Sequence, residues 1–353
     1  MTVTILIGDV ITRLRELPDD HFDCVVTSPP YWGLRDYGVE GQIGLEPTLA
    51  EHLEKMIEVF AEVHRVLKPS GTCFVNYGDC YATTPNGRSA ADTKAAGDDD
   101  RTFRDKPFST IQGVLKPKDL CMVPNRFAIA MQEWGWWVRS EIIWAKPNPM
   151  PESIADRPAT AHEKIFMFTK TAKYFWDAEA VRVPAAVSSI QRWSQDIASQ
   201  DGSERANGGA KTNGNMKAVG GPKKDKQRGH GKRHAGFNDR WDAMSKEEQQ
   251  ANGRNLRNYE PAPVDVWKIA TKPFREAHFA TFPPELVERS LKAGCPSGGR
   301  VLDPFGGAGT TGLVADQMGF DCTLIELNPK YAEIMEKRIR SDAGMFSDVE
   351  VTS

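Results

Sequence analysis

The loop TSPPYW follows directly on HFDCVV, an apolar run typical of a buried strand, and it combines hydrogen-bond acceptors, aromatic rings and a stiff backbone at the end of that strand. The hydroxyl of Ser28 and the carbonyl of Pro29 can accept hydrogen bonds from an amino group. Pro30 follows, and the two rings hold this stretch of backbone rigid. Tyr31 offers an aromatic face to a planar ring, with Trp32 beside it as a support. Prolines and aromatic residues after a strand also occur for structural reasons, so the loop alone leaves both interpretations open.

A second loop, DPFGGAGTTG, leads from a predicted strand, VLD, into a predicted helix. Gly307, Gly309 and Gly312 match GxGxxG, and Glu326 lies in the next apolar run, CTLIEL. Such glycines let a ligand approach the backbone at a helix start, and the acid can accept hydrogen bonds from ribose hydroxyls. Asp303 would repel a pyrophosphate and attract a cationic amino-acid group. The pattern predicts an adenosine cofactor, with a dinucleotide as the literal alternative, and the lack of a following lysine argues against a phosphate-binding P-loop.

Both loops need a scaffold that brings them together, and predicted strands alternate with predicted helices along the chain. Short β-branched runs predict strands, and apolar residues three and four positions apart predict helices. The predicted strands are 3–9, 23–30, 71–79, 138–147, 163–171, 301–303 and 322–327, and the predicted helices include 11–20, 49–68, 125–137, 278–294 and 328–339. This alternation predicts an α/β fold, with a mostly parallel twisted sheet, helices on both faces and ligands at the carboxyl ends of the strands.

Two polar segments interrupt this pattern. Residues 82–118 are rich in Asp, Gly, Thr and Lys without periodicity, which predicts a mobile insertion. Residues 183–263 contain few aliphatic side chains, and between Arg205 and Arg240 ten Lys or Arg residues stand against two acids. That second segment is either a solvated loop or an arm that binds the phosphates of a nucleic acid.

Composition limits the alternatives. The 353 residues carry a formal net charge of −3, so any affinity for nucleic acid must come from local clustering of charge. The six cysteines form no CxxC pair, which predicts reduced thiols and no metal site. No signal peptide and no membrane-length apolar run is present, so we expect a soluble cytoplasmic protein without a membrane partner.

Taken in this order, TSPPYW and DPFGGAGTTG resemble the motifs of S-adenosylmethionine-dependent DNA amino-methyltransferases of the permuted class, whose catalytic motif precedes the cofactor motif. The resemblance spans most of the chain outside the two polar segments. It implies a Rossmann-like fold, S-adenosyl-L-methionine as cofactor, double-stranded DNA as substrate, and a base that is swung out of the duplex onto Ser28, Pro29, Pro30 and Tyr31. The cofactor residues that it implies are Asp303, Phe305, Gly307, Gly309 and Thr310, with Glu326 on the ribose, and Phe282 and Asp9 in the same pocket.

The resemblance also implies how the chain is organised. It divides into a catalytic half at 1–183, a basic target-recognition region at 184–262, a cofactor half at 263–343 and a C-terminal tail at 344–353. The residues expected to contact DNA are Lys223, Lys224, Lys226, Arg228, Lys232 and Arg233. A homodimer and a cognate restriction enzyme are expected partners by resemblance alone.

The residue before ProProTyr bears on the target base. In this family serine accompanies N4-cytosine enzymes most often, whereas aspartate or asparagine accompanies N6-adenine enzymes, so Ser28 favours N4 of cytosine. N6 of adenine remains the alternative. An RNA methyltransferase, a catalytically inactive DNA-binding protein and a dehydrogenase are more distant alternatives.

Overall fold

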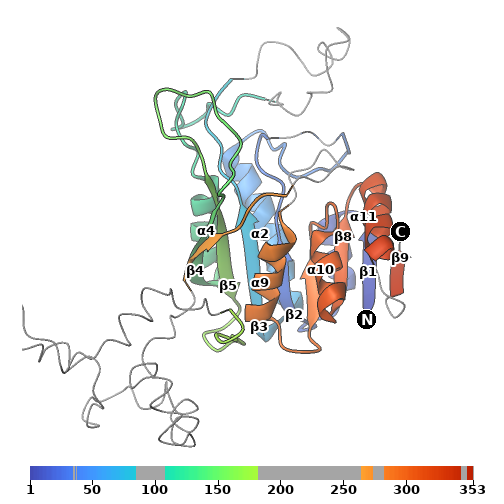
Figure 1. Cartoon of the computed structure of the whole chain (residues 1–353). Helices are drawn as coiled ribbons and strands as arrows, with labels where there is room; N and C mark the ends of the chain where they lie inside the picture. Colours follow the sequence, from blue (N-terminus) through green and yellow to red (C-terminus); the bar gives the residue numbers. More distant parts are fainter. Residues whose placement is uncertain are drawn as a thin grey trace, which may run out of the picture. The chain divides into compact units, whose positions relative to one another are not determined.

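The computed structural model describes residues 1–34, 36, 38–84, 108–181, 264–272, 282–342 and 348–352. The chain divides into two compact units. One unit combines Met1–Ala180 with Asp265–Ser353 and contains the helices and strands labelled in Figure 1. The other unit, Val181–Val264, contains the predicted basic region, and all of it except its two end residues lies outside the described residues.

A nine-stranded sheet runs through the described part of the first unit, in the order β6-β4-β5-β3-β2-β7-β8-β1-β9. The strands are β1 Thr2–Ile7, β2 Phe22–Thr27, β3 Leu67–Tyr77, β4 Trp137–Ala145, β5 His162–Thr169, β6 Val266–Lys268, β7 Arg300–Asp303, β8 Asp321–Glu326 and β9 Asp348–Thr352. All neighbouring pairs are parallel except the two that β5 makes, with β3 and with β4. The prediction of a mostly parallel sheet is therefore confirmed.

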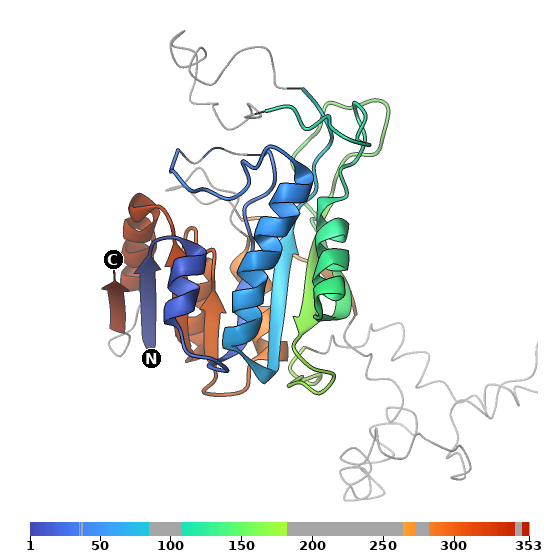
Figure 2. The ribbon, with the colours of Figure 1, turned by 180° about the vertical axis from the view of Figure 1, so that it is seen from behind.

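Helices cover both faces of this sheet. They are α1 Val10–Glu16, α2 Leu49–Val66, α4 Val123–Trp134, α9 Pro284–Gly294, α10 Thr310–Met318 and α11 Pro329–Asp342. Figure 1 shows α9, α10 and α11 in front of the sheet, and Figure 2 shows α1, α2 and α4 on the opposite face. This arrangement confirms the α/β fold that the alternating pattern predicts and the Rossmann-like fold that the resemblance implies.

Local sequence explains where the helices begin. Thr48 and Glu51 form a capping box at the start of α2, in which each side chain accepts from the other residue's backbone N–H. The helix then buries a stripe that includes Met56 and Phe60 against the sheet. In α9 the first residue is Pro284, which lacks an N–H and so leaves no helix donor unpaired at this position.

The central strands carry the core. All six residues of β2 are buried, and so are those of β3 from Gly71 to Tyr77. Burial on both faces explains why these strands read as continuous apolar runs. No helix in the described ranges combines the length and the apolar character needed to cross a membrane.

The order of the strands differs from a simple division into a catalytic and a cofactor half. Strand β1 lies between β8 and β9, among the strands of the predicted cofactor half. The predicted C-terminal tail contains β9, which pairs with β1 from Thr2↔Asp348 to Leu6↔Thr352. The segments predicted as two halves thus contribute interleaved strands to one compact unit.

Both ends of the predicted mobile insertion, 82–118, are packed against the rest of the unit. Ala82, Thr110 and Leu115 are buried, and the backbone of Ala82 is hydrogen-bonded to Asp119 and Lys118. The buried side chains and paired backbone fix residues 82–84 and 108–118 against the unit. Residues 85–107 lie outside the described part of the chain.

Candidate active site

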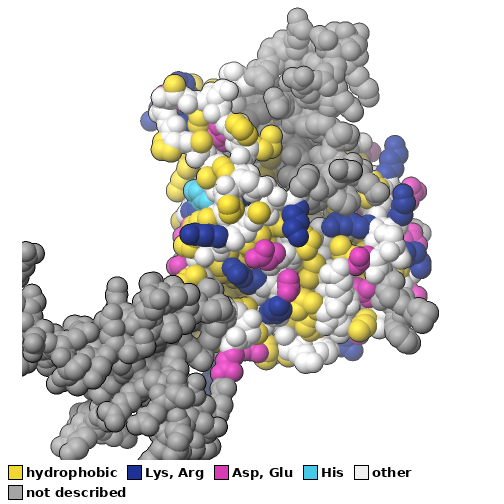
Figure 3. Space-filling view, viewed as in Figure 1, with side chains coloured by type: hydrophobic (Ala, Val, Ile, Leu, Met, Phe, Trp, Pro, Cys, Tyr) yellow, Lys and Arg dark blue, Asp and Glu magenta, His cyan; other side chains and the backbone are white. Residues whose placement is uncertain are grey.

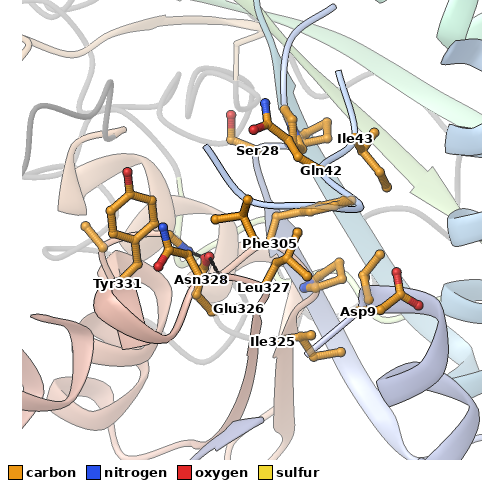
Figure 4. A pocket seen from close by; sticks show the side chains of 18 of the residues that line it. Asp9, Ser28, Gln42, Ile43, Phe305, Ile325, Glu326, Leu327, Asn328 and Tyr331 are labelled. Carbon is orange, nitrogen blue, oxygen red and sulfur yellow. Dashed lines mark hydrogen bonds between the residues drawn. The ribbon is translucent and has the colours of Figure 1, made fainter. Parts of the chain in front are cut away.

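A pocket lies at the carboxyl ends of four neighbouring strands, β2, β7, β8 and β1. Ser28 follows β2, Phe305 follows β7, Glu326 ends β8 and Asp9 follows β1, and all four residues line the pocket. Parallel strands present their carboxyl ends at one edge of the sheet, so residues from opposite ends of the sequence, such as Asp9 and Glu326, meet there. Figure 4 shows Ser28 and Gln42 on one side of this pocket and Glu326 and Asn328 on another, with Phe305 between them.

The SPPY segment lines the pocket with all four of its residues, Ser28, Pro29, Pro30 and Tyr31. The Tyr31 ring packs against the ring of Tyr77 with centroids 5.5 Å apart. The two prolines restrict the backbone that follows β2, so the segment holds the Ser28 hydroxyl and the Pro29 carbonyl in fixed positions.

Trp32 has a structural environment. It is 1% exposed, and its Nε1 donates to the Glu46 carbonyl at 3.0 Å. The ring belongs to the core and fixes the course of the loop after Tyr31.

Glu326 is a largely buried carboxylate on the opposite wall. Its oxygens accept from the backbone N–H of Gly307 at 2.9 Å and of Asn328 at 2.8 Å. Burial nevertheless raises the pKa of Glu326 to about 7. A ligand that supplies hydroxyl donors or positive charge would stabilise the ionised form of this buried acid. A ribose supplies such hydroxyls, and a cationic amino acid supplies such a charge.

Other predicted cofactor residues share this wall. Phe282, Phe305, Gly307 and Thr310 line the pocket. Asp9 also lines it, and its Oδ1 accepts from the backbone N–H and the hydroxyl of Thr12, both at 2.9 Å, which caps α1.

The structure places Asp303 differently from the sequence prediction. It is 1% exposed and is absent from the described residues that line the pocket. Its carboxylate accepts from the hydroxyls of Thr27 at 2.6 Å and Thr311 at 2.7 Å, and from the Phe305 N–H at 3.0 Å. Burial raises the pKa of Asp303 to about 6, although these three donors stabilise its charged form. Asp303 therefore joins the end of β2 to the cofactor loop from behind the pocket.

Gly309 also has a different environment from the predicted one. Its φ is +73°, and a Cβ at this position would lie 2.4 Å from Cγ of Met335 on α11. Gly309 thus allows the loop to pack closely on α11, while Gly307 faces the pocket. Arg338 on α11 holds the same loop, since its Nη1 donates to the Ala308 carbonyl at 2.8 Å and to the Thr310 hydroxyl at 3.0 Å.

A third part of the wall was not predicted from the sequence; it is formed by Val39, Gly41, Gln42 and Ile43. The acid that follows them fixes this segment: the Glu46 carboxylate accepts from the Gly44 N–H at 2.9 Å and lies 2.7 Å from Nδ1 of His52. Burial opposes ionisation of Glu46, but the contact with His52 lowers the pKa of its carboxyl below the usual value. Closely spaced glycines in GQIGLE were the available signal for this loop.

A polar cluster beside Ser28 was also not predicted from the sequence. The Tyr31 hydroxyl donates to Oε2 of Glu163 at 2.9 Å, and Nδ2 of Asn76 donates to the same oxygen at 2.9 Å. Lys146 forms an ion pair with Oε1 of Glu163. An asparagine inside the apolar run FVNY was the available signal, because a polar side chain in a buried strand needs a partner.

The predicted DNA-contacting residues, from Lys223 to Arg233, lie outside the described residues. Within the described ranges, no three His, Cys, Asp or Glu side chains form a group that could hold a metal ion.

Comparison with known proteins identifies the family. The sequence model of N6_N4_Mtase, described as DNA methylase, matches residues 22–337. The chain belongs to this DNA methylase family. The methylase is 39% identical over 337 residues to the type II methyltransferase M.XycI of Xanthomonas campestris pv. cyanopsidis, covering 96% of this chain and 87% of that relative.

Two solved structures share the fold of the methylase. One is TTHA0409 of Thermus thermophilus, a putative DNA modification methylase complexed with S-adenosyl-L-methionine, with a TM-score of 0.54, 20% identity and 99% of each chain covered. The other is the cytosine-N4-specific PvuII DNA methyltransferase, with a TM-score of 0.56, 18% identity, and 99% of this chain and 95% of that chain covered.

The methylase is an S-adenosylmethionine-dependent DNA methyltransferase, as its family implies. Its own residues fit this cofactor. The Glu326 carboxylate and the Gly307 backbone suit a ribose, and the apolar side chains of Phe282, Phe305 and Ile325 suit a purine ring and a thioether chain.

Proposed function

We propose that the methylase transfers a methyl group from S-adenosyl-L-methionine to N4 of a cytosine that has been rotated out of double-stranded DNA. The observation that carries this proposal is the shared pocket, which Ser28 and Pro29 line from one loop and Glu326 from another. Such a pocket brings an amine and a methyl donor within reach of each other.

The chain's own residues would prepare the amine. An exocyclic amine is a weak nucleophile because its lone pair is delocalised into the ring. Hydrogen bonds from the NH₂ group to the Ser28 hydroxyl and the Pro29 carbonyl would make the nitrogen more tetrahedral and release that pair. When bound, S-adenosylmethionine supplies an electrophilic methyl group on its sulfonium. Direct transfer needs no enzyme nucleophile, which agrees with Cys24, a thiol fully buried inside β2.

Cytosine is favoured over adenine because Ser28 stands before ProProTyr and because the PvuII enzyme, which shares this fold, is cytosine-N4-specific. The test is mass spectrometry of nucleosides from unmethylated genomic DNA that has been incubated with the methylase and S-adenosylmethionine. We expect N4-methylcytosine. Detection of N6-methyladenine alone would replace the proposed base with the alternative one, and no methylated nucleoside would reject the proposal.

Affinity for S-adenosylmethionine is predicted to rise with pH through the pKa of Glu326. A pKa of about 7 leaves this carboxyl largely protonated at lower pH, whereas a cationic ligand with ribose hydroxyls favours the charged form. Binding should therefore release a proton, and the Kd should increase by up to about tenfold for each pH unit below about 7. Calorimetry at two pH values, on either side of this pKa, measures the change.

The variant Glu326→Gln is the control for this pH dependence, because it leaves the other buried acid of the site, Asp303, in place. Burial raises the pKa of Asp303 only to about 6, and its carboxylate is held by Thr27, Thr311 and Phe305 behind the pocket. Substitution Glu326→Gln should make the affinity nearly independent of pH above about 6. Equal wild-type affinities at both pH values would contradict the assignment of Glu326 to the cofactor.

Contact with DNA is proposed for the basic region at 184–262, through Lys223, Lys224, Lys226, Arg228, Lys232 and Arg233. On the face viewed in Figure 3, lysine and arginine side chains lie among acidic ones, so this face offers a mixed field to a polyanion. A concentrated basic segment would supply the missing attraction. The name type II methyltransferase, which M.XycI carries, supports a cognate restriction enzyme as partner, and a homodimer is proposed from the resemblance.

A further inference from the structure

Three neighbouring strands place a carboxylate next to the proposed target site. Asn76 lies on β3, Glu163 on β5 and Lys146 directly after β4. The register pairs Asn76 with Ile165 and Ala145 with His162, so these three side chains meet at one end of the sheet. Glu163 and Lys146 are each 19% exposed as side chains, which leaves the pair partly shielded from solvent.

The hydroxyl groups between Ser28 and Glu163 are ordered in one direction. Ser28 Oγ donates to the Tyr31 hydroxyl at 3.5 Å, and the Tyr31 hydroxyl donates to Oε2 of Glu163 at 2.9 Å. Since the proton of Ser28 points toward Tyr31, a lone pair of Ser28 Oγ remains to accept from a substrate amine. The first contact is long, as catalytic hydrogen bonds often are before substrate binds.

We infer that Glu163 receives the proton that the methylated amine loses, relayed through the hydroxyls of Ser28 and Tyr31, and that Asn76 and Lys146 hold the carboxylate in place. This rests on the proposed function, in which the amine lies against Ser28. Glu163 acts through other groups and is therefore a positioning and proton-accepting residue.

The atoms and charges balance. As the nitrogen–carbon bond forms and the sulfonium sulfur–carbon bond breaks, the amine becomes a cation. One N–H bond then breaks: its proton passes to Ser28 Oγ, the Ser28 proton passes to the Tyr31 oxygen, and the Tyr31 proton passes to Oε2 of Glu163. The products are a neutral methylamino base, neutral Ser28 and Tyr31, and a protonated Glu163 that afterwards returns its proton to water.

The surroundings suit a relay better than a tyrosinate base. Burial, reinforced by the Glu163 charge, raises the pKa of Tyr31 well above its usual value, so the phenol passes a proton on only as it receives one. A protonated ring-linked amine is a strong acid, so a carboxylate is basic enough to accept its proton.

Asn76 provides a second observation. It is 2% exposed, and its Nδ2 lies 3.5 Å from Ser28 Oγ, 3.2 Å from the Tyr31 hydroxyl and 2.9 Å from Glu163 Oε2. Its Oδ1 is buried without a hydrogen-bond partner among the described residues. An unpaired buried acceptor destabilises the fold, so a role beyond packing explains why an amide occupies this position.

The test compares Glu163→Gln and Tyr31→Phe with a matched control, Glu141→Gln. Glu141 also pairs with a lysine, Lys164, across β4 and β5, but among the described residues its carboxylate has no hydrogen bond to Tyr31 or Asn76, whereas that of Glu163 has both. Single-turnover transfer of tritiated methyl groups to unmethylated genomic DNA is measured against pH at saturating S-adenosylmethionine, so that the titration of Glu326 does not shape the profile. S-adenosylmethionine affinity is measured separately by calorimetry. Among the described residues, the ionisable groups that contact Glu163 are Tyr31 after β2 and Lys146 after β4.

We expect Glu163→Gln and Tyr31→Phe to lower the transfer rate by about 30-fold or more, with cofactor affinity within about twofold of wild type. Glu163→Gln should also remove the acidic limb of the pH–rate profile, which a purely structural loss would leave in place. Suppose that wild type and Glu141→Gln both transfer label. If Glu163→Gln and Tyr31→Phe then transfer it at rates within about threefold of wild type, or if Glu163→Gln keeps the acidic limb, the inference is overturned and the proposed function stands. If wild type transfers no label, the proposed function falls, and the inference with it.

Discussion

Replacing Ser28 with alanine is expected to slow methyl transfer by about 1,000-fold while leaving the affinity for S-adenosylmethionine within about twofold. The hydroxyl would accept from the target amine and connect it to Tyr31, so its loss removes an acceptor and the route for the proton. The proposed cofactor contacts come from the ends of β7, β8 and β1, which the substitution leaves intact. Single-turnover transfer measures the first quantity, and calorimetry measures the second.

Ser290→Ala is a matched control for this prediction. Ser290 on α9 is fully buried, and its hydroxyl donates to the Leu286 carbonyl at 2.9 Å within the same helix. Ser290→Ala should lower the stability of the fold somewhat and leave the rate of methyl transfer unchanged. A Ser28→Ala enzyme that transfers methyl groups within about threefold of the wild-type rate would show that the hydroxyl does not prepare the amine.

Strands with a strong local signal were predictable from the sequence. β2 and β3 are continuous apolar runs because helices bury both of their faces. β9 has no such signal: in DVEVT only Val349 is buried, and the strand depends on its pairing with β1 at the other end of the chain. An edge strand of this kind is specified by its partner more than by its own residues, so a tail was the natural prediction.

The site divides in the same way. Motifs specify which residue types stand at the end of a strand, and this placed Ser28 and Glu326 correctly on the pocket wall. They do not specify which way each residue faces, so Asp303 and Gly309 were predicted in the pocket although they pack behind it. Glu163 was missed because its partner, Tyr31, is 132 positions away, and only the antiparallel pairing of β5 with β3 brings them together.

Glu326→Gln is predicted to weaken S-adenosylmethionine binding by about 100-fold at a pH above the pKa of Glu326, where the wild-type carboxyl is charged. A neutral amide makes weaker hydrogen bonds to ribose hydroxyls and has no attraction for a cationic ligand. It also cannot accept from the Gly307 and Asn328 N–H groups with two oxygens, as Glu326 does. Calorimetry at about pH 8 gives the ratio of the two Kd values.

Stability separates this effect from damage to the fold. Folding raises the pKa of Glu326 above its unfolded value, so the stability that its protonated form supplies at low pH is lost as pH rises through about 7. Above that pH the buried charge destabilises the unliganded protein, and a neutral glutamine removes this cost. Because the glutamine removes the charge but satisfies only one of the two N–H groups, the variant should unfold at a temperature close to that of wild type without cofactor, while binding the cofactor far more weakly. Glu333→Gln, at an exposed position of α11, should change neither quantity. A buried acid that lowers stability is explained by a ligand that needs its charge. If Glu326→Gln binds S-adenosylmethionine with a Kd within about threefold of wild type, Glu326 is not that contact and the ribose lies elsewhere.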